Sequence, residues 1–329
     1  MHKSMLHFCR LFVGTLALAA FAMDGHAQPY PSKPITVRIG FPAGGPADAA
    51  IRSAAVVLQR SLSQTLVLEN NPGANGSLAT MNVVNAAPDG YTLLGTTGTD
   101  FVLAPLSMAS AKYTFDQFKL LGVVGISDFL LVSSAAHSFK SPREVIAAAK
   151  SNSGKLSIAH WGPGSTPHLA AAAFQAQSGI RLNEIPYKGA APAITAIGGS
   201  QVDLSFVPLG GPVMGLIQSG RLKPIALAAP KRNPALPDVP TISESLGLAN
   251  FEFTVWTGLF APKATPEPVV RLLTEAMNRW IESPENLERI TQGASRRLEV
   301  MTPAQAAAFL ETEHRKLTGI AKTLNLEAN

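Results

Sequence analysis

The segment Phe41-Pro42-Ala43-Gly44-Gly45-Pro46-Ala47-Asp48 joins two patterns of different period. Before it, residues 35–39 alternate apolar and polar side chains, and after it apolar residues continue at helical spacing to Leu62. A strand, a glycine turn and a helix in this order expose free backbone N–H groups at the positive end of a helix dipole. The segment therefore predicts an anion receptor made of backbone. An ordinary strand-to-helix turn is the alternative, because glycine and proline occur in loops of every kind.

The composition indicates a globular protein. The chain has 329 residues, of which 46% are hydrophobic and 15% charged. This is enough apolar material for one large or two medium domains with their own cores, and it excludes an intrinsically disordered chain.

The N-terminus has the pattern of a secretory signal peptide. Lys3 and Arg10 precede the apolar run 11–23, and Gly25-His26-Ala27 places small residues at both positions that a signal peptidase reads. We expect cleavage after Ala27 and export as a soluble protein. Cys9, the single cysteine, lies within this signal and before its apolar run, so the mature chain has no disulfide or thiolate, and Cys9 is no lipid attachment site.

The charge of the mature chain suits a small anion better than a nucleic acid. Removal of residues 1–27 takes away Lys3, Arg10 and Asp24, which leaves 25 basic and 21 acidic residues and a net charge of +4. The basic residues are scattered and form no run interleaved with aromatic residues. We therefore predict no nucleic-acid partner.

Strands alternate with helices along the whole mature chain, which predicts an α/β fold with a mainly parallel sheet. A second strand, glycine turn and helix begins at residue 155, with the turn at His160-Trp161-Gly162-Pro163-Gly164-Ser165-Thr166-Pro167. Each of Thr265-Pro266, Ser283-Pro284 and Thr302-Pro303 predicts a helix start, so residues 265–329 are expected to be helical. The repeated unit favours two lobes, residues 28–127 plus 252–329 and residues 128–251, with the chain crossing between them near 128 and 252.

An enzymatic interpretation finds little support in the motifs. Ser165 on its turn suggests a secreted serine hydrolase with His168 as base, but the nucleophile elbow needs glycine two places before and two places after the serine. Gly164 directly precedes Ser165, and Pro167 stands two places after it. No metal or nucleotide motif is present, so no cofactor is predicted. Asp48 is favoured as an acceptor for donors near the helix start rather than as a general base.

A binding interpretation uses the same residues better. Two glycine turns, one in each lobe, would supply N–H donors from both sides to a dicarboxylate or similar small anion held between them. A few charge-assisted hydrogen bonds, each worth about 1.5–3 kcal/mol, suffice for micromolar affinity. Trp161 either covers the body of the ligand or packs between the lobes.

A series of short motifs, in order along the mature chain, resembles the Bug family of extracytoplasmic solute receptors of tripartite tricarboxylate transporters. The motifs are Tyr30-Pro31-x-Lys33-Pro34-Ile35, Phe41-Pro42-x-Gly44-Gly45-x-x-Asp48, Glu69-Asn70-x-Pro72-Gly73-Ala74-x-Gly76, residues 87–94 (APDGYTLL), Gly162-x-Gly164-Ser165-x-x-His168-Leu169, Pro186-Tyr187-Lys188-Gly189 and Leu236-Pro237-Asp238-Val239-Pro240-Thr241. Each motif is weak by itself, but the ordered series is specific.

The resemblance implies a two-lobed periplasmic binding protein of type II topology, with a ligand cleft between the lobes. It implies a monomer that closes on a small organic carboxylate and passes it to an inner-membrane permease of the tripartite tricarboxylate type, or signals its presence. The expected ligand-binding residues are Phe41, Gly44, Gly45, Ala47, Asp48, Thr97, Gly98, Thr99, Trp161, Gly162, Gly164, Ser165, Thr166 and Val207.

Two departures from the family pattern bear on the ligand. Family members usually have proline where Ala43 stands, a change that the turn should tolerate. They commonly have an acid after the strand at 202–206, where this chain has Val207-Pro208. The loss of the acid argues against an amino-acid ligand and, together with Trp161, favours an apolar or aromatic carboxylate.

Overall fold

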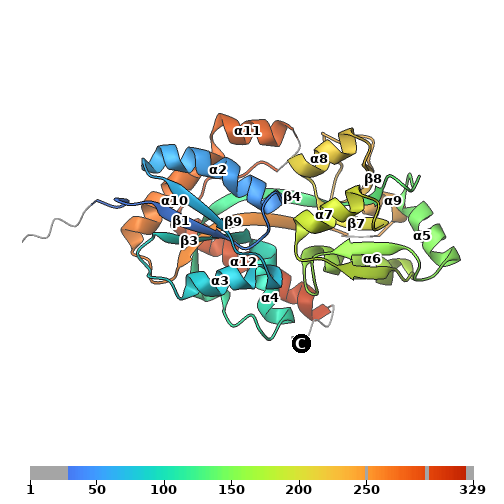
Figure 1. Ribbon diagram of the computed structural model, residues 1–329, viewed down its shortest axis with the longest axis horizontal. Helices are drawn as coiled ribbons and strands as arrows, with labels where there is room; N and C mark the ends of the chain where they lie inside the picture. The colour runs from blue at the N-terminus through green and yellow to red at the C-terminus, as the bar shows by residue number, and fades with distance from the viewer. Residues whose placement is uncertain (1–28, 249–250, 293–295, 324–329) are drawn as a thin grey trace, which may run out of the picture. The chain divides into compact units, whose positions relative to one another are not determined.

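A computed structural model of the chain describes residues 29–248, 251–292 and 296–323. The predicted signal peptide lies outside the described residues, as do the last six residues of the chain. Residues 33–329 form one compact unit, and all strands and helices belong to it (Figure 1).

The unit is built on a nine-stranded mixed sheet. In spatial order the strands are β2 (Leu66–Asn70), β1 (Ile35–Ile39), β3 (Thr92–Thr97), β9 (Thr254–Pro262), β4 (Phe118–Ser134), β7 (Leu204–Pro208), β5 (Ser157–His160) and β6 (Asn183–Pro186), and β8 (Leu222–Ala228) also pairs with β4. β1 pairs with its neighbours in parallel, as does β5, but every pairing of β4 and β9 is antiparallel. The expected α/β fold is confirmed, whereas the expectation of a mainly parallel sheet is wrong.

The long strand β4 divides the sheet into two sections. Residues 118–128 pair with β9, and residues 129–134 pair with β7 and β8. We call β2, β1, β3, β9 and the start of β4 the first section, and the end of β4 with β7, β8, β5 and β6 the second section. The sequence predicts only the second part of β4, from Asp128. Irregular pairing between Leu120 and Gly122, and again between Val123 and Gly125, shifts the register in the first part and hides its period.

Helices cover both sections. They are α2 (Pro46–Leu62), α3 (Ser77–Val84), α4 (Gly98–Ser107), α5 (Pro142–Ser151), α6 (Thr166–Ser178), α7 (Ala190–Gly198), α8 (Gly211–Gln218), α9 (Ile242–Leu246), α10 (Glu267–Ile281), α11 (Pro284–Thr291) and α12 (Pro303–Thr323), with short 3-10 turns at Ala74–Gly76 and Phe115–Gln117. The three predicted C-terminal helix starts are confirmed by α10, α11 and α12. In Figure 1, α2 lies above β1 and β3, while α3 and α4 lie below them.

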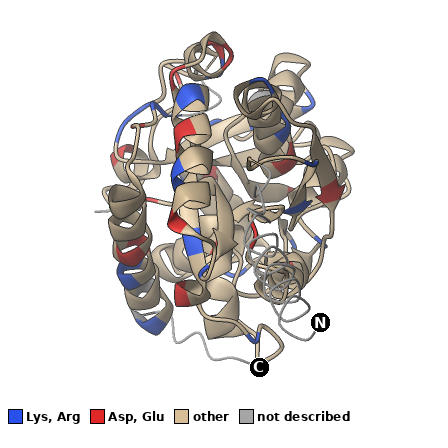
Figure 2. Ribbon diagram, turned by 90° about the vertical axis from the view of Figure 1, so that its left-hand side faces the viewer, with Lys and Arg blue, Asp and Glu red and all other residues tan. Residues whose placement is uncertain are grey.

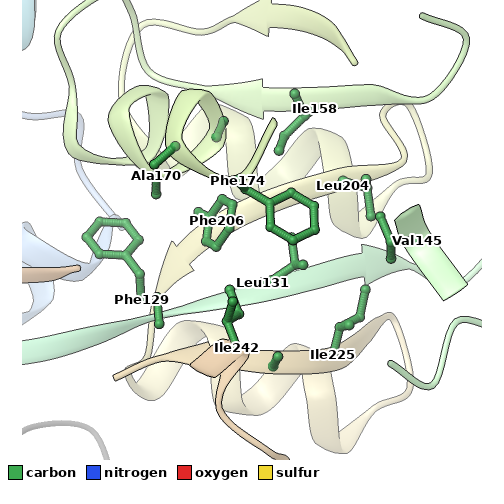
Figure 3. Close-up of a cluster of buried hydrophobic side chains, with 14 of the residues drawn as sticks. Phe129, Leu131, Val145, Ile158, Ala170, Phe174, Leu204, Phe206, Ile225 and Ile242 are labelled. Atoms are coloured by element: carbon green, nitrogen blue, oxygen red, sulfur yellow. The ribbon is translucent and has the colours of Figure 1, made fainter. Parts of the chain in front are cut away.

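The core of the second section forms between α6 and the sheet. Phe174 of α6 points toward Phe206 of β7 and Leu131 of β4, all three fully buried (Figure 3). The rings of Phe174 and Phe206 meet edge to face at 6.1 Å. The small side chains Ala170 and Ala171 let α6 approach the strands closely, which the alanine-rich sequence made possible.

Charged residues of both signs share the surface. On the face drawn in Figure 2, basic and acidic residues alternate along the helices instead of gathering by sign. Among the described residues, no helix combines the length and the hydropathy needed to cross a lipid bilayer.

Candidate functional site: a cavity at three helix N-termini

A cavity of about 170 Å³ lies where the two sections of the sheet meet. Its wall includes the first glycine turn and the adjoining face of α2, Thr97 at the end of β3, and Gly125 and Ser127 of β4. The second section contributes Trp161, Pro208 and the starts of α7 and α8. The wall is therefore made by both sections and is mostly apolar, as is typical of a pocket for a small organic molecule.

Besides α4, whose first turn carries the acidic Asp100, three helices begin at this cavity without a side-chain cap. Gly45 caps α2, Gly189 caps α7 and Gly210 caps α8, and none of the three helices has a side-chain hydrogen bond at its cap. The amides of the first helical turn have no intrahelical acceptor and lie at the positive end of the helix dipole. Three such ends around one cavity make it attractive to an anion.

Glycine allows these turns to come close together. A Cβ on Gly189 would lie 2.8 Å from Cδ of Pro42, and Gly189 has a φ of +113°, which L-residues rarely adopt. Gly45 lies opposite Ala191, whose backbone nitrogen would be 3.6 Å from an added Cβ. The first turn therefore packs directly on the start of α7.

Asp48 organises the first turn and does not line the cavity. It is only 2% exposed, and its carboxylate accepts hydrogen bonds from the amide of Gly44 (2.9 Å), Nδ2 of Asn70 (2.9 Å) and Nε of Arg52 (2.9 and 3.0 Å). Burial alone would raise the pKa of Asp48, but the hydrogen bonds from Arg52, Asn70 and Gly44 lower it overall. The carboxylate is thus held ionised as a structural acceptor, as the sequence favoured.

The amides of the second glycine turn are used within the protein. Gly162 donates to Nδ1 of His160 and Gly164 to Nδ1 of His168, each at 3.1 Å. Ser165 donates to the carbonyl of Gly162, and Thr166 to Oδ1 of Asp100 at 3.2 Å. These four amides, which the sequence predicts as donors to a ligand, have acceptors within the protein in this structure: two histidines, a carbonyl and an aspartate.

Asp100 is a site residue that the sequence does not single out. Its side chain is 1% exposed, lines the cavity, and accepts hydrogen bonds from Thr97 Oγ1 (2.7 Å), Trp161 Nε1 (3.4 Å) and both the amide and hydroxyl of Thr166. Burial raises the pKa of its carboxyl group overall, although the hydrogen bonds from these four donors act to lower it. Asp100 ties the end of β3 to the start of α6. Its position in the first turn of a helix that follows a strand is the sequence signal that could have found it.

The predicted site residues fall into two groups. Those that line the cavity are Phe41, Gly45, Ala47, Thr97 and Trp161. Gly44, Asp48, Gly98, Thr99, Gly162, Gly164, Ser165, Thr166 and Val207 are not among the lining residues.

Most of the second group have structural contacts that explain their absence from the wall. Gly98 accommodates Trp256, whose Cζ2 would lie 2.0 Å from an added Cβ. Val207 is fully buried in the core that α7 and α8 cover, and its neighbour Pro208 faces the cavity instead. Side chains alternate along a strand, so a shift of one residue moves the contact to Pro208.

Ser165 and His168 are not arranged as a catalytic pair. The hydroxyl of Ser165 donates to the carbonyl of Gly162 at 2.7 Å, and the residue has no exposed surface. Nδ1 of His168 accepts from Gly164, and its Nε2 lies 3.6 Å from a carboxylate oxygen of Glu184. Both ring nitrogens thus have other partners. Among the described residues, no cluster of three or more histidine, cysteine or acidic side chains is placed to hold a metal ion.

Comparison with known proteins places the chain in a receptor family. The family described as "Tripartite tricarboxylate transporter family receptor" matches residues 50–326. Protein BugT of Bordetella pertussis is 32% identical over 316 residues, which cover 93% of this chain and 94% of BugT.

Solved structures are similar over most of the chain. The periplasmic binding protein BugD aligns with a TM-score of 0.84 at 32% identity, covering 91% of this chain and all of that one. MatC of Rhodopseudomonas palustris with bound malate aligns with a TM-score of 0.82 at 29% identity, covering 88% of this chain and 99% of MatC. R. palustris Rpa4515 with adipate aligns with a TM-score of 0.85 at 25% identity, covering 91% of this chain and 100% of Rpa4515. The chain therefore belongs to the family of tripartite tricarboxylate transporter receptors, the Bug-type periplasmic solute-binding proteins.

Proposed function

We propose that this receptor captures a small organic carboxylate in the cavity between the two sections of its sheet. The observation that carries the proposal is the convergence of three uncapped helix N-termini, those of α2, α7 and α8, on one cavity of about 170 Å³. The bound malate of MatC and the bound adipate of Rpa4515 support carboxylates as the ligand class.

The wall of the cavity favours an apolar body between the charged groups of the ligand. Phe41, Trp161, Pro208 and Val255 all line it. Trp161 also packs on Phe129, with ring centroids 5.8 Å apart, so it contributes both to the core and to the wall. An apolar or aromatic carboxylate, as the sequence favoured, would bury its stem against these side chains.

We further propose that the receptor closes by rotation of residues 128–251 against residues 28–127 and 252–329. Support comes from β4, which changes its partners between Asp128 and Phe129, and from β9, whose start at Thr254 lies near the second crossing. Asn75 Nδ2 donates to the carbonyl of Pro163 at 2.8 Å in this structure, and we expect this contact to break when the receptor opens. The mature protein would begin at Gln28, act as a periplasmic monomer without enzymatic activity, and serve a permease of the tripartite tricarboxylate type or a sensor.

Native mass spectrometry of the purified protein, followed by a thermal-shift panel, tests this function. We expect a retained small acid, or a rise in Tm with aromatic and aliphatic mono-, di- or tricarboxylates and no turnover of the ligand. Stabilisation by aspartate or glutamate alone would contradict the apolar ligand. The absence of stabilisation by every carboxylate would refute the receptor function itself.

A further inference from the structure

Arg289 brings a positive charge to the wall of the cavity. It lies in the last turn of α11 and lines the cavity together with Gln292. The first turn of α11 is tied to the C-terminal end of α2 by the ion pair between Glu285 and Arg60. α11, which lies above α2 in Figure 1, thus runs from that end of α2 toward the cavity, where Arg289 meets the same wall as Ser53.

The guanidinium group of Arg289 has no anionic partner among the described residues. Its Nη1 is buried and makes no hydrogen bond there, and the acid one turn earlier, Glu285, pairs with Arg60 instead. The group lies over the ring of Trp280, 5.6 Å from its centroid. Trp280 is fully buried, and its Nε1 donates to the carbonyl of Val124, so it is a fixed support.

Arg289 as a whole is partly exposed, but its Nη1 is buried, and a buried cationic group without a partner loses hydration and gains no hydrogen bond in return. Burial accordingly lowers the pKa of Arg289. An anion entering the cavity would supply the missing partner, and arginine can bind a carboxylate through two parallel hydrogen bonds.

The starts of α2 and α7 are separated from Arg289 along the α2 wall of the cavity. This wall follows α2 from Pro46 to Ser53, a distance of about 10 Å at the rise of an α-helix. Gly45 at the start of α2 lies opposite Ala191 of α7, whereas Glu285, one turn before Arg289, pairs with Arg60 beyond the Ser53 end. Apolar side chains, among them Val255 and Pro208, also line this cavity.

We propose that Arg289 binds a second anionic group of the ligand, so that the receptor selects a dicarboxylate with an apolar body over a monocarboxylate of the same length. This inference rests on the proposed function, which requires only one carboxylate at the helix N-termini. Arg289 is then a specificity-determining residue of this chain.

The experiment combines a change in the protein with a change in the ligand. Succinate, glutarate, adipate and pimelate, each with its monomethyl ester, are titrated by calorimetry into the wild-type protein, Arg289→Met and Arg289→Lys. Arg315→Met, which removes an exposed cation of α12 outside the cavity wall, is the matched control. Thermal unfolding of each variant without ligand verifies that it is folded.

We expect the wild-type protein and the control to bind the best diacid about 10–100-fold more tightly than its monoester, as one charge-assisted contact predicts. Arg289→Met should bind both the diacid and its monoester with the affinity that the wild-type protein has for the monoester. The affinity of Arg289→Lys for the diacid should lie between those of the wild-type protein and Arg289→Met. Equal weakening of diacid and monoester in Arg289→Met, or no weakening of either, would overturn the inference. Wild-type binding of monoesters without preference for diacids would also overturn it and leave the proposed function intact, whereas no binding of any carboxylate would refute that function.

Discussion

Replacing Gly164 by alanine tests the contact between the second glycine turn and α4. Gly164 has a φ of +74°, and an added Cβ would lie 2.0 Å from Oγ and 2.4 Å from Cβ of Ser107. Rotation of the Ser107 side chain moves Oγ but not Cβ, so the backbone of the turn or of α4 must shift. Gly179, at the end of α6, has a φ of +62° and nothing within 4 Å of an added Cβ. Gly179→Ala is therefore a control that carries the backbone strain without the clash.

The two variants should differ in their free energy of unfolding. A left-handed conformation costs alanine about 1 kcal/mol relative to glycine, which both variants share. Overpacking against Ser107 adds about 1–3 kcal/mol to Gly164→Ala alone. At about 2–4 °C per kcal/mol for a chain of this size, Gly164→Ala should lower Tm by about 4–16 °C and Gly179→Ala by about 2–4 °C.

Scanning calorimetry and urea unfolding of the two variants measure this difference. Ser107→Gly removes both clashing atoms, so the double variant Gly164→Ala/Ser107→Gly should be more stable than the sum of the single changes by about 1–3 kcal/mol. Equal stability of Gly164→Ala and Gly179→Ala, or additive effects in the double variant, would show that the turn does not press on α4.

Two further predictions concern titratable groups. Burial lowers the pKa of His160, with a further contribution from the charge of His168, and burial also lowers the pKa of His168. Their folded pKa values therefore lie below the unfolded value of about 6.5, so the stability that they contribute is complete above that pH and declines as the pH falls below it. Tm measured from pH 7.5 to 5 should fall more steeply in the wild-type protein than in His160→Gln/His168→Gln, and parallel curves would contradict this. Asp48→Asn should lower the free energy of unfolding, measured in urea, by about 1–3 kcal/mol, because the amide cannot accept hydrogen bonds from Gly44, Asn70 and Arg52 together. Asp116→Asn, at an exposed position, is the control. An equally small loss in both variants would contradict the structural role of Asp48.

The first glycine turn could be predicted because its information is local. Residues 35–62 contain the strand period, the glycine turn and the helix period in sequence order, and β1 and α2 form as expected. The starts of α7 and α8 carry a similar local signal, glycine shortly before proline at a helix start, in Gly189-Ala190-Ala191-Pro192 and Gly210-Gly211-Pro212. That both starts lie at the same cavity is not local information, so the sequence does not place them there.

The second glycine turn shows why similar sequence does not give similar function. Both turns follow a strand and precede a helix, but the amides at the start of α6 face Asp100, which lies 66 residues earlier in the chain. A hydrogen-bond acceptor so distant in sequence can be assigned only when the fold brings it into contact. The same limit hid Arg289, because an arginine in the last turn of an ordinary surface helix is not distinctive until the cavity beside it is known.

The sequence by itself determined the α/β class, the succession of helices and strands, the glycine turn at Phe41–Asp48 and, through its ordered motifs, the receptor family. Apolar periodicity and turn residues act over a few positions, so they can be read along the chain. Only the tertiary structure decided which helix N-termini remain free, which donors are already used within the protein, and that Arg289 reaches the cavity. Those properties depend on pairs of groups far apart in sequence, and packing alone determines which of them meet.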